Sequence, residues 1–349
     1  MTTTGSVKKI VAMGIMIIAI SGMLVSICAS TYAADKIFKL KMQAFTHRNS
    51  VTTETSTLPF VKYAKEMSNG RLDIQYFDGG VLVNAKEGFS AVSDGVIDIL
   101  ADGNFYQSGI MPVQKLIYGY PGCYRNLVES LSFLHRFGGA EILREAYKKH
   151  NAYFLGIQPD AGVSLLSKKP IRTVEDLKGL KVRVGGGLGA TLKAAGASPV
   201  SVSPAEIYTS LSTGVIDGVV YGGVAVADRL KLQEIAKYWM TPYLLGTHNI
   251  VVYLVNLKTW NELPDDLKAI LQAAFNSVET KLYEADYNLD RKVAEVWREK
   301  YGVKFINFPE EEHDKLNRFS VGLMDELAAK DPVSAKAVSA IKEMWKALR

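Results

Sequence analysis

Short stretches that alternate between apolar and polar residues run along the chain, separated by stretches with apolar residues at helical spacing. Residues 37–42 and 72–76 alternate in this way and predict half-buried strands. Residues 97–101, 153–157, 180–184 and 216–220 predict further strands. Helical patterns lie between them, including one that stops at Asn69-Gly70 and a long one over residues 126–149. Strands that alternate with helices predict an α/β fold with two mainly parallel sheets.

Two loops in the middle of the chain have turn or capping residues that predict where helices begin. Residues 185–189 are rich in glycine and predict a loop between the strand at 180–184 and a helix over residues 190–195. Farther along, Ser203 fits the N-cap of a second helix, Pro204 its first position, and Glu206 the capping-box partner.

The longest helical pattern follows Pro264 and reaches Tyr301 without a further proline or a glycine. A helix of this length measures about 55 Å at 1.5 Å per residue, which exceeds the width of one ordinary domain. The pattern therefore predicts a long helix spanning both domains. The alternative is two helices that break near Glu284-Ala285.

The first 33 residues have the pattern of a cleaved secretory signal peptide. Lys8 and Lys9 precede an apolar run over residues 10–27, and small residues follow up to Ala33. We expect cleavage near Ala33 and a periplasmic protein without direct membrane insertion. Two alternatives are a retained anchor, because the run approaches the length of a membrane span, and a lipid attached to Cys28.

Composition and charge exclude several classes of protein. Hydrophobic residues make up 48% and charged residues 22% of the chain, as in folded soluble proteins. The net charge of +5 is scattered and no basic run is interleaved with aromatic residues, so we expect no nucleic-acid partner. Once residues 1–33 are removed, Cys123 has no cysteine to pair with, and we expect it to be a buried thiol.

Signatures of catalysis are nearly absent. The five histidines lack metal-ligand spacing, and neither a nucleophile elbow nor a phosphate-binding Walker loop occurs. The exception is a dinucleotide-type pattern formed by Gly185, Gly187 and Ala190 between a strand and a helix. The next strand ends in Ser203, not in the acidic residue that would bind a ribose. The glycines otherwise bring backbone N–H groups close to an anionic ligand.

Arg183 lies in an apolar strand that leads into this glycine-rich loop. A guanidinium in such a place must find a carboxylate or several hydrogen-bond acceptors, because an unpaired buried charge is costly. Its planar fork matches a carboxylate with two hydrogen bonds. The spacing leaves a second interpretation open, since Lys181 and Arg183 share one face of the strand and that face could meet solvent.

Several ordered motifs resemble the extracytoplasmic binding proteins of tripartite ATP-independent periplasmic (TRAP) transporters, the DctP-type family. Leu177-Lys178-Gly179-Leu180-Lys181-Val182-Arg183 is similar to that family's Lys-Gly-Leu-Lys-x-Arg signature. The similarity continues at residues 196–200, 206–208 and 211–218, and Gly95-Val96-Ile97-Asp98 resembles a first-domain step of the family. Asn256, Trp260 and Leu263-Pro264 also fit. The resemblance covers essentially all of residues 35 to 330.

This resemblance implies a two-domain periplasmic binding protein fold with the ligand between the domains. We expect domain I to comprise residues 34–160 and 249–288, and domain II residues 161–248 and 289–349. Arg183 falls on the family's arginine for the ligand carboxylate. The resemblance places the other ligand-binding candidates at strand and loop ends: Phe45, His47, Asn84, Asn104, Tyr106, Gly185, Gly186, Tyr221 and Gly222.

Two departures from the family pattern refine the expected ligand. Val219-Val220-Tyr221 replaces the segment whose acidic residue lets some relatives hold calcium, so we expect no metal and no cofactor. Sialic-acid-binding members have a second arginine near the position of Val163, and its absence here argues against sialic acid. We therefore expect a non-enzymatic receptor that delivers a small monocarboxylate, such as a keto, hydroxy or aromatic acid, to the small and large TRAP membrane subunits. The alternative function is an exported oxidoreductase that binds a dinucleotide at residues 185–190.

Overall fold

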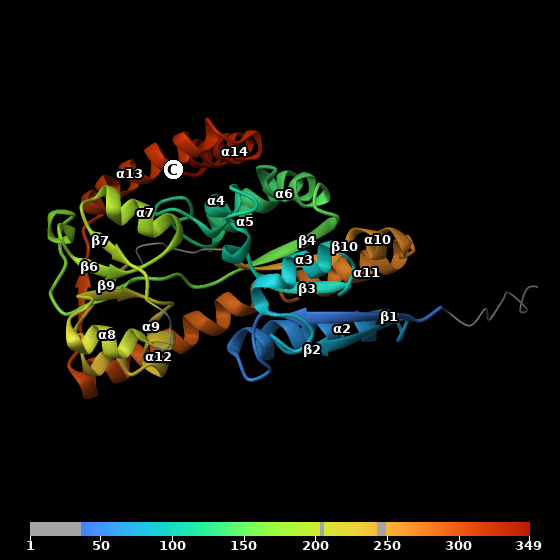
Figure 1. Ribbon diagram of the computed structural model, residues 1–349, viewed down its shortest axis with the longest axis horizontal. Helices are drawn as coiled ribbons and strands as arrows, with labels where there is room; N and C mark the ends of the chain where they lie inside the picture. Colours follow the sequence, from blue (N-terminus) through green and yellow to red (C-terminus); the bar gives the residue numbers. More distant parts are fainter. Residues whose placement is uncertain (1–35, 203–205, 243–248) are drawn as a thin grey trace, which may run out of the picture. The chain divides into compact units, whose positions relative to one another are not determined.

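The structure, a computed structural model, describes residues 36–202, 206–242 and 249–349. Within residues 39–349 the strands form two sheets, with helices packed against them (Figure 1). The predicted signal peptide, the predicted caps Ser203 and Pro204, and the nature of Cys28 lie outside the described residues. None of the helices in the described part of the chain combines the length and the apolar character that a membrane span requires.

The first sheet has five strands in the order β2-β1-β3-β10-β4. β1 and β3 are parallel, whereas β10 runs antiparallel to both β3 and β4 and separates them. The sheet is therefore mixed, and β10 was not predicted from the sequence. The strands are β1 (Phe38–Ala44), β2 (Leu72–Phe77), β3 (Ile99–Gly103), β4 (Ala152–Pro159) and β10 (Asn249–Asn256).

The second sheet has six strands in the order β11-β9-β5-β8-β6-β7. β6 is parallel to β7 and β8, and β5 runs antiparallel to β8 and β9. The expectation of mainly parallel sheets is correct for β6, β7 and β8, but β5 makes this sheet mixed too. The strands are β5 (Leu165–Ser167), β6 (Lys181–Arg183), β7 (Ser198–Val200), β8 (Gly218–Val220), β9 (Tyr238–Thr241) and β11 (Lys304–Asn307).

Helices up to residue 194 connect these strands. The predicted helical region over residues 126–149 divides into two helices at Gly138, which has a positive φ of 78°. The elements are η1 (Thr53–Thr57, a π-helix), α2 (Leu58–Met67), η2 (Ala85–Glu87), α3 (Gly88–Ser93), η3 (Asn104–Gln107), α4 (Gln114–Tyr118), α5 (Leu127–Arg136), α6 (Gly139–Lys148), η4 (Glu175–Leu177) and α7 (Gly186–Ala194).

Helices also make up most of the chain after residue 206. These elements are α8 (Ile207–Thr213), α9 (Val224–Arg229), η6 (Leu232–Glu234), α10 (Leu257–Glu262), α11 (Asp265–Asn276), α12 (Lys281–Tyr301), α13 (Glu310–Ala328) and α14 (Pro332–Leu348). Asn256 caps α10 by accepting hydrogen bonds from the N–H groups of Lys258 and Thr259.

The predicted helix over residues 264–301 is two helices, α11 and α12, with turns at residues 277–280. The break lies at Val278, whose carbonyl oxygen accepts a hydrogen bond from the side-chain amide of buried Gln158 at 2.7 Å. Ser277 donates its hydroxyl back to the carbonyl oxygen of Ala273 at 2.9 Å. The single long helix is therefore wrong, and the alternative break near Glu284-Ala285 is misplaced by one to two turns.

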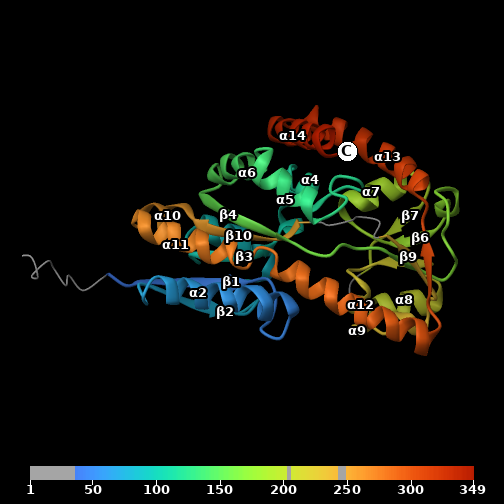
Figure 2. The ribbon, with the colours of Figure 1, turned by 180° about the vertical axis from the view of Figure 1, so that it is seen from behind.

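α12 nevertheless links the two sheets, as the prediction of a shared helix requires. It contacts η1, strand β4 of the first sheet, and α9 beside the second sheet. Figure 2 shows α12 running from the first sheet to the second. Its 21 residues span roughly 31 Å. The mixed α/β architecture with a helix shared between its two parts is thus confirmed.

Buried side chains form a separate core on each face of the second sheet. Neighbouring residues of one strand point to opposite faces, so Leu165 and Val220 join one cluster while Leu166 and Val219 join another. A larger cluster packs the first sheet against α5, α6 and α14. The predicted domain boundaries stay a prediction, and these contacts favour placing α14 with the first sheet although its residues fall within the predicted domain II.

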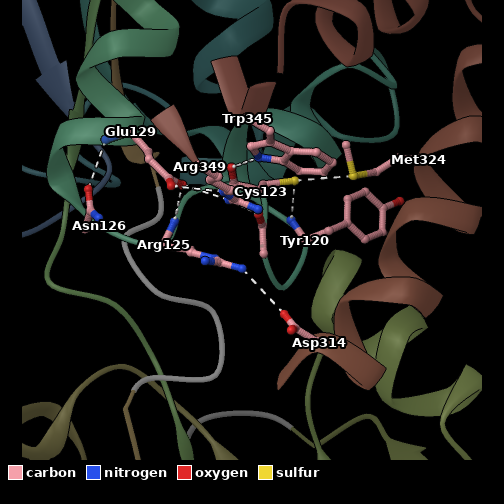
Figure 3. Close-up of polar contacts among 10 residues, drawn as sticks. Tyr120, Cys123, Arg125, Asn126, Glu129, Asp314, Met324, Trp345 and Arg349 are labelled. Atoms are coloured by element: carbon pink, nitrogen blue, oxygen red, sulfur yellow. Dashed lines mark hydrogen bonds and ion pairs between the residues drawn. The ribbon is translucent and has the colours of Figure 1, made fainter. Parts of the chain in front are cut away.

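Polar contacts hold α14 against the loop that precedes α5 (Figure 3). Arg349 forms an ion pair with Glu129 at 2.8 Å and donates to the carbonyl oxygen of Gly122 at 2.7 Å. The indole of Trp345 donates to the carbonyl oxygen of Cys123 at 3.0 Å. Cys123 is fully buried, and burial raises the pKa of its thiol to about 12. The expectation of a buried, unpaired thiol is confirmed.

Candidate functional site

The carboxyl ends of parallel strands from both sheets meet around one cavity. In the second sheet, β6 ends at Arg183 and its parallel neighbour β8 ends at Val220. In the first sheet, Phe45 follows β1 and residues 105–106 follow the parallel strand β3. Loops at such strand ends form the ligand sites of many α/β proteins. The cavity has a volume of about 840 Å³, which is typical of a small-molecule site.

Arg183 lies half-buried in the wall of this cavity. Its Nε donates to the carbonyl oxygen of Val202 at 3.3 Å, and its Nη1 donates to that of Val220 at 3.0 Å. The guanidinium also lies over the ring of Tyr221, 5.0 Å from the ring centre. Burial lowers the pKa of Arg183, and no carboxylate among the described residues forms an ion pair with it. The side chain is therefore fixed by neutral groups and carries a charge that no described acidic residue balances.

Lys181 lies on the same strand but is exposed, and its ammonium group bonds to the carbonyl oxygen of Gly214. Of the two interpretations that the sequence left open, the structure therefore favours the one in which Arg183 faces a cavity. Lys181 and Arg183 differ in exposure because Arg183 is the last residue of β6, at the end of the strand that is followed by helix α7.

The glycine-rich segment after Arg183 also lines the cavity, but its conformation differs from the predicted loop. Helix α7 begins at Gly186, not at Ala190. A Cβ at Gly187 would lie only 2.9 Å from the ring of Tyr120 and 3.1 Å from a carbonyl oxygen. The glycine thus permits the first turn of α7 to pack closely against Tyr120.

Aromatic side chains make up another large part of the cavity lining. Phe45 lies 6.4 Å from Tyr106, and Phe105 lies 4.4 Å from Tyr106, measured between ring centres. Tyr118 and Tyr120 come from α4 and the residues after it. Burial raises the pKa of Tyr118 well above its ordinary value, so this hydroxyl stays protonated. Together these side chains offer an apolar surface for the carbon skeleton of a ligand.

Three acidic side chains line another part of the cavity: Asp160, Asp286 and Asp290. Asp290, from α12, is buried and accepts a hydrogen bond from the N–H group of Ala225 at 2.8 Å, which anchors the start of α9. Burial, together with the nearby charges of Asp160 and Asp290, raises the pKa of Asp286 to about 8. Arg229 lies near enough to oppose part of this shift. Asp286 is therefore largely protonated at neutral pH.

Seven of the ten residues predicted to bind ligand line the cavity: Phe45, Tyr106, Arg183, Gly185, Gly186, Tyr221 and Gly222. His47 and Asn84 do not line it. Both are exposed, and Asn84 instead caps η2 by accepting from the N–H group of Lys86. Asn104 is fully buried and does not line the cavity, and neither atom of its side-chain amide has a hydrogen-bond partner among the described residues. Ligand contact by any of the ten stays a prediction.

Several lining residues were missed by the sequence analysis. Asp160 directly follows β4, as Phe45 follows β1, so its position at a strand end could have been predicted in the same way. Asp286 and Asp290 are four residues apart on α12 and so share one face of a helix, as do Gln114 and Tyr118 on α4. Within the described ranges, no group of three or more His, Cys, Asp or Glu side chains is arranged to hold a metal ion. The expectation of a metal-free site stays a prediction.

Comparison with known proteins identifies the family. Residues 44–331 match the sequence model of a family described as "Bacterial extracellular solute-binding protein, family 7", also called DctP. A relative from Nostoc sp., named "Monocarboxylate 2-oxoacid-binding periplasmic protein", is 28% identical over 296 residues, which are 82% of this chain and 78% of that protein.

Solved structures show the same fold. A TRAP periplasmic solute-binding protein from Pseudoalteromonas atlantica, solved with bound sodium and pyruvate, has a TM-score of 0.79 and 26% identity, with coverage of 90% of this chain and 95% of the other. One from Colwellia psychrerythraea, with bound calcium and pyruvate, has a TM-score of 0.78 and 26% identity, with coverage of 88% and 94%.

The chain belongs to the DctP family of extracellular solute-binding proteins, as the sequence motifs predicted. Its fold is that of the two-domain TRAP solute-binding proteins. This family and these structural relatives are solute-binding receptors, and they give no support to the alternative of an oxidoreductase that binds a dinucleotide at residues 185–190.

Proposed function

We propose that this protein captures a small monocarboxylate in the cavity at Arg183 and delivers it to the small and large membrane subunits of a TRAP transporter. The observation that carries the proposal is the guanidinium of Arg183, which is fixed in the cavity wall without an ion pair to any described residue. A carboxylate matches the guanidinium in charge and in geometry. A ligand carboxylate thus supplies the counter-charge that the cavity lacks beside Arg183.

The aromatic wall and the relatives narrow the class of acid. The named Nostoc relative binds 2-oxoacids, and two similar structures hold pyruvate. The rings of Phe45, Phe105 and Tyr106 favour a ligand with an apolar or aromatic portion beside its carboxylate. Keto, hydroxy and aromatic monocarboxylates all meet these requirements.

A comparison of acids with their uncharged amides tests the carboxylate requirement. We expect at least one of pyruvate, lactate, phenylpyruvate and benzoate to bind in calorimetry and to raise the melting temperature, since a ligand at 100 times its Kd stabilises the folded state by about 2.7 kcal/mol. The matching amide should bind at least about 30-fold more weakly, because it leaves Arg183 without a counter-charge. Equal binding of acid and amide, or no binding by any of the four acids, would contradict the proposal.

We further propose that the protein works in the periplasm after cleavage of its first 33 residues. The basic start, the apolar run and the small-residue exit support this, and the family is described as extracellular. Intact-mass measurement of protein released by osmotic shock should give a chain that begins at or near Ala34. Recovery of the complete N-terminus from purified membranes would instead support a retained anchor.

A further inference from the structure

Gln114 brings an unused hydrogen-bond acceptor to the cavity wall. It begins α4, one helical turn before Tyr118, and both residues line the cavity. The Gln114 side chain is fully buried, and its Oε1 has no hydrogen-bond donor among the described residues. A buried acceptor without a hydrogen-bond donor lowers the stability of the fold. A ligand in the cavity that donates a hydrogen bond to Oε1 would remove this cost.

A chain of buried side chains behind the wall fixes which way the Gln114 amide points. As a carboxylate, Asp102 can only accept from the amide of Gln107, whose Nε2 donates to Asp102 Oδ2 at 2.8 Å. Gln107 therefore presents its Oε1 to Tyr147, whose hydroxyl donates to it. The hydroxyl oxygen of Tyr147 in turn accepts from Gln114 Nε2 at 3.0 Å.

Each hydrogen bond in this series determines whether the next group donates or accepts. Because the Tyr147 hydrogen is committed to Gln107, the oxygen of Tyr147 is an acceptor, and the NH2 group of Gln114 must face it. A flipped Gln114 amide would set two acceptors against each other. All of these side chains except Asp102, which begins the chain, are neutral. Burial raises the pKa of Asp102 to about 7. A proton on Oδ1, which has no hydrogen-bond partner among the described residues, leaves Oδ2 as the acceptor from Gln107.

We propose that Gln114 is a specificity-determining residue, whose Oε1 accepts a hydrogen bond from a hydroxyl or amino group on the ligand. This inference rests on the proposed function, with the ligand's carboxylate at Arg183. It narrows the ligand to hydroxy- or amino-substituted monocarboxylates and disfavours acids whose only other polar group is an oxo group. A site built to accept from a ligand donor rejects analogues that lack the donor.

Matched sets of acids test this inference in the unmodified protein. Butanoate is compared by calorimetry with its hydroxy and amino derivatives at carbons 2, 3 and 4, and phenylacetate with its 4-hydroxy and 4-amino derivatives. In at least one set, the hydroxy or the amino acid should bind about tenfold or more tightly than the unsubstituted acid. The comparison of hydroxy with amino derivatives shows which donor is preferred.

The Gln114→Leu variant should remove this preference, because leucine has similar size and no acceptor. Gln75→Leu is the matched control, since Gln75 is exposed on β2 and does not line the cavity; it should keep the preference in full. Acids that lose affinity with Arg183→Ala but bind alike with and without a donor would overturn the role of Gln114 and leave the proposed function intact. A donor preference that survives in Gln114→Leu would also overturn it. Equal binding of an acid and its uncharged amide would instead contradict the proposed function itself.

Discussion

The Arg183→Ala variant should bind its carboxylate ligand about 30- to several-thousand-fold more weakly than the unmodified protein, a loss of roughly 2–5 kcal/mol. The reason is that the ligand carboxylate would remain desolvated in the cavity without the guanidinium. The carbonyl oxygens of Val202 and Val220 hold that guanidinium in place and cannot bind an anion themselves. Calorimetry on folded protein measures the effect.

Two further variants separate charge from geometry at this strand. Arg183→Lys keeps the charge but loses the planar fork and the contact with Tyr221, so its affinity should remain clearly reduced. Lys181→Ala is the matched control on the same strand, because Lys181 is exposed and does not line the cavity. It should change the affinity by less than about threefold. If Arg183→Ala binds the acid as the unmodified protein does, Arg183 does not bind the ligand.

The Trp297→Ala variant should lose about 3–5 kcal/mol of the free energy of unfolding. Trp297 is fully buried on α12, and its ring centre lies 5.8 Å from that of Trp239 in an edge-on contact. Its indole N–H donates to Asp228 at 2.7 Å, beside a second donor, Gln233. The substitution therefore both opens a cavity and removes one of the hydrogen bonds of a carboxylate. Urea denaturation followed by circular dichroism measures the loss.

The neighbouring residue on the same helix provides the control for this change. Val296 is 47% exposed, and Val296→Ala should stay within about 0.5 kcal/mol of the unmodified protein. Similar losses in both variants would show that the helix as a whole, and not the packing of Trp297, determines stability there.

The sequence predicted the strand-end residues of the site better than its other walls. Arg183, Phe45 and Tyr221 follow or end strands that local sequence patterns predict, so their place at strand ends was predictable from nearby residues, and the family resemblance made them ligand-binding candidates. Asp286 and Asp290 come from a helix far along the chain, and their approach to the cavity depends on how α12 packs. No local pattern encodes that packing.

Other errors have the same origin. The break between α11 and α12 involves the side chain of Gln158, which is 120 positions away from Val278 along the chain. β10 is buried, so residues 250–255 form a continuous apolar run that lacks the alternation by which half-buried strands were recognised. In both cases contacts with distant residues decide the structure: the contact of Gln158 with Val278 for the helix break, and the pairing with β3 and β4 for β10.

The position of β10 has a consequence for how the chain is made. β10 fills the gap between β3 and β4, although it is synthesised after every strand of the second sheet except β11. A nascent chain that has not reached Asn249 carries two unpaired strand edges where β10 belongs, and such edges promote aggregation. Pairing between residues so far apart in sequence is also slow to form. The first sheet therefore closes only when most of the chain has left the ribosome.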